Sequence, residues 1–300
     1  MRITQRAIVT TSLQGLNSNL GAVNDLQKQL TSGKTISRPS DSPTGTNTSM
    51  YTRRDLAGVE QQARAIADGK SVLSETDSAL QDMLDQVRLV RNLALQAMNE
   101  GGMSPESQQA VTAQVAGLRD SLLGRANTVV QGRPVFGGVT TGSRAYDDAG
   151  TYLGVGGAGG VAVRPLTRRV SDVEAVRIDI TGPEALNDRA TGKDLFSVVA
   201  GIAAHTGDVE ALRTDIAALD GVMSSMLGAL ADVGTRAARL DAAGEVNASR
   251  GLTLTAQLAA TEDVDLAKTM MELKQRQTGY EAALQATAQA IQPTLLDFLR

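Results

Sequence analysis

Both ends of this 300-residue chain place apolar residues at the spacing of a coiled coil, and the stretches 1–38 and 184–292 contain no proline. Glycine-rich turns and strand-like alternation are confined to the middle. Uninterrupted helices are therefore expected toward both ends. We predict a mainly α fold, in which paired N- and C-terminal segments form a long antiparallel helical bundle or coiled coil and a small β-rich domain is inserted in the middle.

The apolar stripes of the two terminal arms are the residues that we predict to make assembly and partner contacts. Apolar residues follow steps of three and four in the N-terminal arm, and two series in the C-terminal arm repeat every seven residues. The core helix of a globular domain carries the same kind of stripe, so two interpretations stay open. The candidates are Leu13, Leu16, Leu20, Val23 and Leu30 in the first arm and Leu266, Met270, Leu273, Tyr280, Leu284, Ile291 and Leu296 in the second.

The terminal arms are too poor in apolar residues to be stable alone. Ordering a backbone residue costs roughly 1 to 2 kcal/mol, whereas full burial of one leucine or valine contributes only about 1.5 to 3 kcal/mol. We therefore expect residues 1–45 and 262–300 to be disordered in the monomer and to become helical when their stripes meet a partner helix. The partner would be the other terminus, a neighbouring copy or a chaperone.

Composition excludes several classes of function. The chain has no cysteine, so disulfides, a thiol nucleophile and a cysteine metal site are absent. A net charge of −4 and a pI near 5.2 give no general affinity for nucleic acid or for an anionic membrane. We see neither a membrane-spanning apolar run nor a cleavable secretory signal. We therefore expect no nucleic-acid or membrane partner, and a protein that is cytosolic or leaves the cell without such a signal.

Periodicity and turn residues indicate how the rest of the chain is organised. Apolar residues recur every seven positions from Val59 to Ala94, and Ser104-Pro105-Glu106 has the form of a helix start. Ten of the 29 residues in 132–160 are glycine, which excludes a helix there. Further along, the alternation of Val176, Ile178 and Ile180 with polar residues predicts a strand.

Helical spacing returns after Gly192 and continues to the C-terminus, with breaks expected near residues 244–251 and 261–263. A fixed turn is expected from Arg38 to Pro43, because residues before proline avoid the helical conformation. These signals divide the chain into an inner terminal coiled-coil domain (1–45 and 262–300), a helical bundle domain (46–131 and 205–261) and a variable β-rich outer domain (132–204).

Four fragments imitate functional motifs. Ser32-Gly33-Lys34-Thr35 resembles the end of a phosphate-binding loop, yet it closes a helix instead of opening one. Gly154–Gly160 resembles a dinucleotide loop, yet a strand is expected directly after it. The single histidine, His205, lacks companions for a metal site, and we place it in a helix N-terminal region with a structural role. Asp147-Asp148 lacks metal-loop spacing. We predict no catalytic residue, no metal site and no cofactor, and so no enzyme.

Motifs at both ends resemble those of the bacterial flagellin superfamily and, within it, the family of hook-filament junction proteins. The resemblance covers roughly residues 1–140 and 205–300, in order. It rests on Met1-Arg2-Ile3-Thr4, Leu16-Asn17-Ser18-Asn19-Leu20, the run from Leu30 to Pro43, Arg133 to Gly138, Glu262 to Ala267, Tyr280 to Leu284 and Leu295 to Leu299.

The resemblance implies a non-enzymatic building block of the extracellular flagellum. Its terminal helices would form an inner coiled coil, and its copies would form a ring-like collar between hook and filament. The implied partners are further copies of the chain, a hook-side hook-associated protein, flagellin and a flagellar export chaperone. The chaperone would cover the C-terminal stripe before the chain is exported unfolded by the type III apparatus.

Other interpretations stay open at this point. The nearest is flagellin, the filament subunit of the same architecture, and the first hook-associated protein resembles the chain less. From other classes we consider a secreted coiled-coil effector or adhesin, and a hydrolase within the inserted domain. The hydrolase would need a clustered acid/base site among Asp147, Asp148, Asp172 and Asp179.

Overall fold

A computed structural model describes residues 2–99, 104–140, 142–154 and 165–291. The chain divides into two compact units, one made of residues 1–58 and 250–300 and the other of residues 59–249. Long helices dominate both units, which confirms the predicted mainly α fold. The three-domain division expected from the sequence differs from these two units and stays a prediction.

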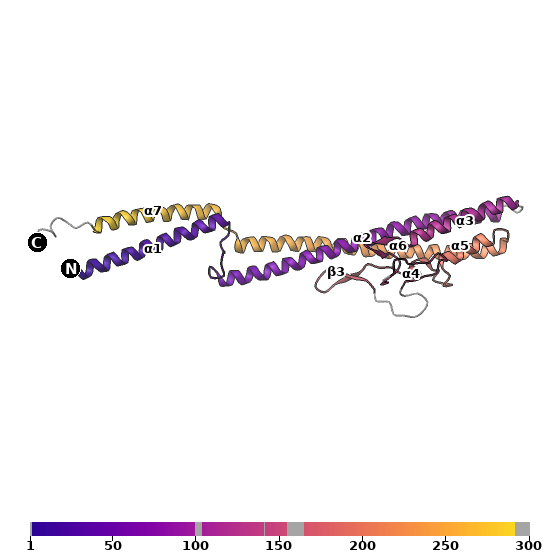
Figure 1. The fold of residues 1–300 in the computed structure, drawn as a ribbon, viewed down its shortest axis with the longest axis horizontal. Helices are drawn as coiled ribbons and strands as arrows, with labels where there is room; N and C mark the ends of the chain where they lie inside the picture. The colour runs from indigo at the N-terminus through magenta and orange to yellow at the C-terminus, as the bar shows by residue number, and fades with distance from the viewer. Residues whose placement is uncertain (1, 100–103, 141, 155–164, 292–300) are drawn as a thin grey trace. The chain divides into compact units, whose positions relative to one another are not determined.

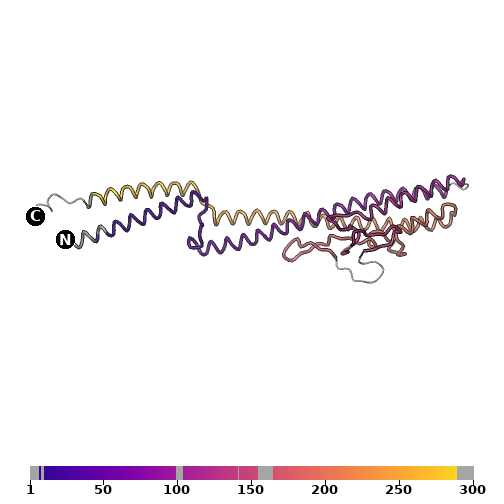
Figure 2. Tube along the Cα trace, viewed as in Figure 1, coloured from indigo at the N-terminus to yellow at the C-terminus, as the bar shows by residue number. Residues whose placement is uncertain are grey.

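The first unit is built on two antiparallel helices from opposite ends of the chain. α1 (Arg2–Ser32) and α7 (Leu266–Ile291) lie side by side, as both the ribbon (Figure 1) and the tube (Figure 2) show. The start of α2 (Pro43–Asn99) and the end of α6 (Val209–Glu262) belong to the same unit. The helix break predicted near 261–263 is confirmed, because α6 ends at Glu262 and α7 begins at Leu266.

The turn predicted between α1 and α2 is also confirmed. The Asp41 carboxylate accepts the backbone N–H groups of Ser37 and Arg38 at 3.0 and 2.8 Å, and these hydrogen bonds hold the pKa of Asp41 below its ordinary value. Pro43 then begins α2, where its fixed φ suits a first helical turn. The link between α1 and α2 is therefore a turn held by its own polar groups.

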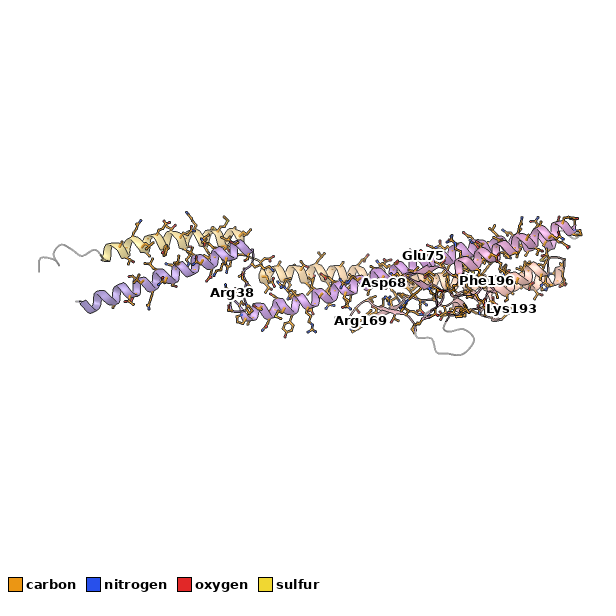
Figure 3. The ribbon with its side chains drawn as sticks, in the orientation of Figure 1. Arg38, Asp68, Glu75, Arg169, Lys193 and Phe196 are labelled. Atoms are coloured by element: carbon orange, nitrogen blue, oxygen red, sulfur yellow. The ribbon has the colours of Figure 1, made fainter. Side chains whose placement is uncertain are left out.

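The second unit contains most of α2 and α6 together with α3 (Pro105–Ala126) and α5 (Leu195–Ala204). Ser104 caps α3 as predicted, since its side chain accepts the N–H of Ser107. Phe196 on α5 is labelled in Figure 3 and is almost fully buried in the core of this unit. The seven-residue repeat of α2 is likewise buried at Val59, Ile66, Leu73, Leu80, Val87 and Ala94.

The described part of the inserted region contains short strands and a short helix. β1 (Val129–Val130) pairs with β2 (Arg133–Pro134), and β3 (Thr167–Arg169) pairs with β4 (Ala175–Arg177), each pair antiparallel. α4 (Gly182–Leu186) follows. Val176, Ile178 and Ile180 are buried as predicted, but the predicted half-buried strand is confirmed only in part, because β4 ends at Arg177 and the polar residues Asp179 and Thr181 are buried too.

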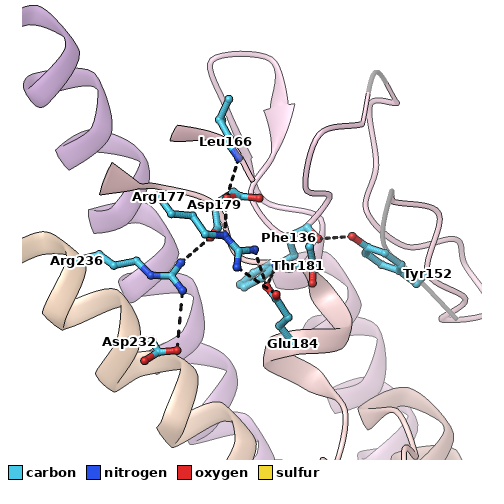
Figure 4. A network of polar contacts seen from close by, with 9 residues as sticks. All are labelled: Phe136, Tyr152, Leu166, Arg177, Asp179, Thr181, Glu184, Asp232 and Arg236. Atoms are coloured by element: carbon cyan, nitrogen blue, oxygen red, sulfur yellow. Dashed lines mark hydrogen bonds and ion pairs between the residues drawn. The ribbon is translucent and has the colours of Figure 1, made fainter. Parts of the chain in front are cut away.

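A network of polar contacts helps to hold the inserted region, whose strands are short, in place (Figure 4). Arg177 donates to Asp179 at 2.9 Å and to Glu184 at 2.8 Å, and Arg236 of α6 donates to the backbone oxygen of Asp179 at 2.7 Å. Burial alone would raise the pKa of Glu184, but the hydrogen bonds from Arg177 and Thr181 outweigh it and hold that pKa below its ordinary value. The network therefore fastens the inserted region to α6.

Two expectations about α6 and its neighbourhood are wrong. The break expected near 244–251 is absent, because α6 is continuous and Asn247 donates a buried 2.9 Å hydrogen bond to the backbone oxygen of Val59 on α2. Packing against α2 thus outweighs the low helix propensity of Gly244 and Gly251. His205 is the C-cap residue of α5 and lies before α6, which begins at Val209, so it is not within a helix N-terminal region; its Nδ1 is 2.7 Å from Asp215 Oδ2.

Other expectations fall partly outside the described residues. The loop expected at Gly154–Gly160 is described only at Gly154, and the strand expected after it only at Pro165.

Among the described helices, α6 has the length and composition of a membrane span, but 44% of its apolar window is buried inside the protein. A core helix of a water-soluble fold passes the same test, so this finding is weak evidence for a membrane.

We predict that Gly150→Ala destabilises the second unit by about 2 to 5 kcal/mol, through combined backbone strain and overpacking. Gly150 has φ +91°, and a Cβ there would lie 2.6 Å from Cβ of buried Phe196. Urea unfolding followed by circular dichroism measures the loss.

The matched control is Gly192→Ala, where φ is +73° and nothing lies within 4 Å of the added Cβ. It carries the backbone strain alone, about 1 to 2 kcal/mol. Equal losses in the two variants would show that close packing against Phe196 does not constrain this turn.

Candidate assembly surface

The register of α1 against α7 follows from two contacts, one where α1 ends and one near the middle of the two helices. Lys34 pairs with Asp263 in an antiparallel bridge, and Arg276 Nη1 lies 3.3 Å from Asn19 Oδ1. The residue numbers in these pairs add to 297 and 295, and both helices rise equally per residue. Residues whose numbers add to about 296 therefore lie at the same level.

This register places Leu16 at the level of Tyr280 and Val23 at the level of Leu273. Leu16 and Val23 are each only 8% exposed, and Leu273 and Tyr280 are partly buried. Leu30 is partly buried as well. These five of the sequence-predicted residues line the inner face between the two helices.

Other predicted residues are more exposed to solvent. Leu13, Leu20, Leu266, Met270 and Leu284 are all exposed, at 41 to 62% of their surface. The two terminal helices thus meet along one apolar face and leave further apolar side chains on the outside. The Ile291 side chain and all of Leu296 lie outside the described residues. The assembly role of the whole set stays a prediction.

Sequence reasoning missed two features of α7. Thr269 is buried between the helices although it is polar, and it lies seven residues after Glu262, a spacing that could have identified it. On the other side of α7, Met271 is 68% exposed beside Gly279, and both line a shallow open groove with Lys274, Gln275, Thr278 and Ala282. No sequence motif pointed to this groove.

A buried carboxylate lies where α1 ends and α6 passes into α7. Glu262 Oε2 accepts from Lys34 Nζ at 2.8 Å and from Arg53 Nη2 at 2.6 Å, and the Glu262 side chain is only 6% exposed. The hydrogen bond from Lys34 is the main cause that lowers the pKa of Glu262, and Arg53 adds to it. The ionised carboxylate therefore stabilises this joint fully at pH values above the ordinary pKa of a glutamate. This stabilisation is lost as the pH falls through the lowered pKa.

Backbone hydrogen bonds surround this ion pair. The backbone N–H of Thr35 donates to the backbone carbonyl oxygen of Glu262 at 2.6 Å, and the backbone N–H of Val264 donates to the backbone carbonyl oxygen of Gly33 at 3.1 Å. Gly33 has φ +70° and ends α1, which confirms that Ser32-Gly33-Lys34 is a helix terminus. We call Gly33–Thr35, Arg53 and Glu262–Val264 together the arm joint.

The acids proposed for a hydrolase serve local structure. Asp147 accepts the N–H of Thr151, Asp148 pairs with Arg144, Asp172 accepts from Gln62 and Asp179 pairs with Arg177. In the described part of the chain, no group of three or more histidine, cysteine or acidic side chains could hold a metal ion.

Comparison with known proteins identifies relatives of this chain. The model of the bacterial flagellin N-terminal helical region matches residues 3–141, and that of the C-terminal helical region matches residues 216–299. Flagellar hook-associated protein 3 of Escherichia coli is 26% identical over 95% of this chain and 96% of its own length. A flagellin of Bacillus subtilis is 25% identical over 97% of both chains.

A solved structure has the same fold. The flagellar junction protein FlgL from Legionella pneumophila superposes with a TM-score of 0.55 at 14% identity, over 73% of this chain and 99% of that one. The two family models cover the N-terminal and C-terminal helical regions in order. The chain therefore belongs to the bacterial flagellin family, whose members are structural proteins of the flagellum and not enzymes.

Proposed function

We propose that this chain is a hook-associated structural protein that joins the hook to the filament of the bacterial flagellum. The similarity to hook-associated protein 3 over nearly the whole length of both chains supports this role. The observation that carries the proposal is the pair of terminal helices, which meet along one apolar face and expose further apolar residues. Flagellin is the second candidate, because the Bacillus subtilis flagellin is similar over the same length.

The exposed apolar residues support assembly through the arms. Leu20 on α1 and Leu284 on α7 leave 41% and 43% of their surface exposed to water, and burial of that remaining surface by another helix would be favourable by about 25 cal/mol per Å². We infer that neighbouring copies supply that helix and that the copies form a ring-like collar. The inner domain of this collar would be residues 1–45 and 262–300, surrounded by 46–131 and 205–261, with 132–204 outermost.

The remaining partners follow from a position between two assemblies. One end of such a collar would contact a hook-side hook-associated protein, and the other would contact flagellin. Before assembly the same apolar arms need cover, so we infer a flagellar export chaperone on the C-terminal arm and type III export of the unfolded chain to the extracellular flagellum. The proposal includes no cofactor.

We predict that Leu20→Asp or Leu284→Asp reduces incorporation into the flagellum by about tenfold or more, because a charge cannot be buried against a neighbouring helix. Each side chain is exposed, at 41% and 43%, so the chain itself should stay folded. The measurement is the amount of each variant in isolated flagella, with circular dichroism of the purified protein as the folding check.

Val173→Asp is the matched control, since Val173 is 98% exposed in the turn between β3 and β4 of the other unit. It should assemble normally. Normal incorporation of the Leu20 and Leu284 variants would remove these residues from the assembly surface.

Immunogold electron microscopy distinguishes the two candidate functions. For a junction protein we expect a single band of label where the hook ends. Label along the whole shaft would identify a filament subunit and contradict the proposed junction role.

Limited proteolysis tests whether the arms depend on partners. In the purified monomer we expect rapid cleavage within residues 1–45 and 262–300 and a resistant fragment from the second unit, because the arms bury few apolar side chains. Mass spectrometry identifies the fragments. Survival of residues 1–38 in the monomer would contradict the predicted disorder.

A further inference from the structure

We propose that Glu262 is the residue that sets the register in which α1 pairs with α7. The inference rests on the proposed function, in which these arms are the assembly elements. It assigns to a buried carboxylate a positioning role that the apolar faces of the helices cannot fulfil. Three observations carry it: the repeat of the apolar faces, the geometry of the arm joint and the identity of the residues seven positions away.

The apolar faces permit more than one register. In the observed pairing, Leu16 lies at the level of Tyr280 and Val23 at the level of Leu273. Because α7 repeats Leu266, Leu273 and Tyr280 every seven residues, a slip of seven keeps the same face inward. It would bring Val23 to the level of Tyr280 or of Leu266, which are again apolar. The stripes alone therefore separate these registers weakly.

The arm joint forms in one register only. Lys34 and Arg53 converge on the same oxygen of Glu262, and the backbone of Gly33–Thr35 bonds to Glu262–Val264 around them. A slip of seven would replace Glu262 by Thr269 or Thr255, and would place Met270 or Ala256 where Asp263 stands. None of these four residues has a carboxylate for Lys34.

The burial of Glu262 makes the wrong registers costly. Its side chain is 6% exposed in the observed pairing. A slip of α1 would take Lys34 away from it and leave it with Arg53 of α2, and losing one partner of a buried ion pair is unfavourable. The contact of Arg276 on α7 with Asn19 on α1 is exposed and 3.3 Å long, so it discriminates less. Glu262 is thus the side chain that favours one register over the slipped ones.

Cysteine trapping in the full-length protein reads the register directly, because the natural chain has no cysteine. Val23→Cys is combined with Leu273→Cys for the observed register and with Tyr280→Cys or Leu266→Cys for the two slipped ones. Disulfides require Cα atoms within about 7 Å, so each pair reports one register. Mild oxidation traps even transient pairing, and non-reducing gels separate intramolecular from intermolecular products.

In the otherwise natural chain we expect the Leu273 pair to form at least about tenfold faster than either slipped pair. Glu262→Gln keeps the size of the side chain and removes its charge, and should reduce that preference to about twofold or less. The double variant Lys34→Met with Arg53→Met should do the same from the other side of the ion pair. A merely structural glutamate would slow all three pairs alike without changing their ratio.

The matched control is Asp25→Asn, which also removes one carboxylate from the first unit, where Asp25 pairs with Lys28 on the same helix. It should keep the preference of the natural chain. An unchanged ratio in Glu262→Gln would overturn the proposal, as would equal trapping of all three pairs in the natural chain. Neither result depends on where the protein lies in the flagellum, so the register and the junction role can fail separately.

Discussion

One buried carboxylate ties together parts of the chain that are more than two hundred residues apart. Glu262 bonds to Lys34 across 228 residues of sequence and to Arg53 across 209. Closing loops of that length from an unfolded chain is entropically unfavourable. Within the second unit, however, α2 and α6 already pair, for example through Asn247 and Val59. Once that pairing exists, forming the arm joint orders only the short ends that remain.

The two units differ in how they are held together. In the second unit a continuous core buries large side chains such as Phe136, Tyr146 and Phe196. The ring centroids of Tyr146 and Phe196 are 4.9 Å apart. Between α1 and α7 the buried apolar side chains are fewer, and Thr269 takes a place among them. Local stability follows burial, so the arms are the part most dependent on partners. The proposed export and assembly of the chain would make use of this difference.

The sequence predicted most of the helices correctly because their signals are local. The repeat of α2 is buried at every predicted position, and Ser104 caps α3, since each signal depends only on residues within a few turns. The break expected near Gly244 is absent, because Val59, which is distant in sequence, stabilises α6 there. His205 was misplaced by a few residues, because α5 continues to Ala204 and α6 begins only at Val209.

The candidate site could be predicted only in part. Heptad spacing correctly located apolar stripes on both arms, but it could not say which of two stripes a helix turns toward its own partner. Leu273 is therefore partly buried, whereas Met270, three residues earlier, is exposed to solvent. Glu262 entered the sequence analysis only as part of a family motif, because nothing near it in sequence shows that Lys34 and Arg53 will meet it.

The arms must satisfy two demands that a single apolar stripe cannot meet together. Under the proposed function, assembly needs an apolar surface that tolerates different coverings, because the inferred copies, chaperone and neighbouring flagellar proteins would all use it. Pairing within the chain needs one register, and a seven-residue repeat does not enforce one. Placing register in a polar joint at one end means that the exposed stripe does not have to set it. A polar residue inside the stripe would fix the register too, but at a cost in stability along the surface that assembly depends on.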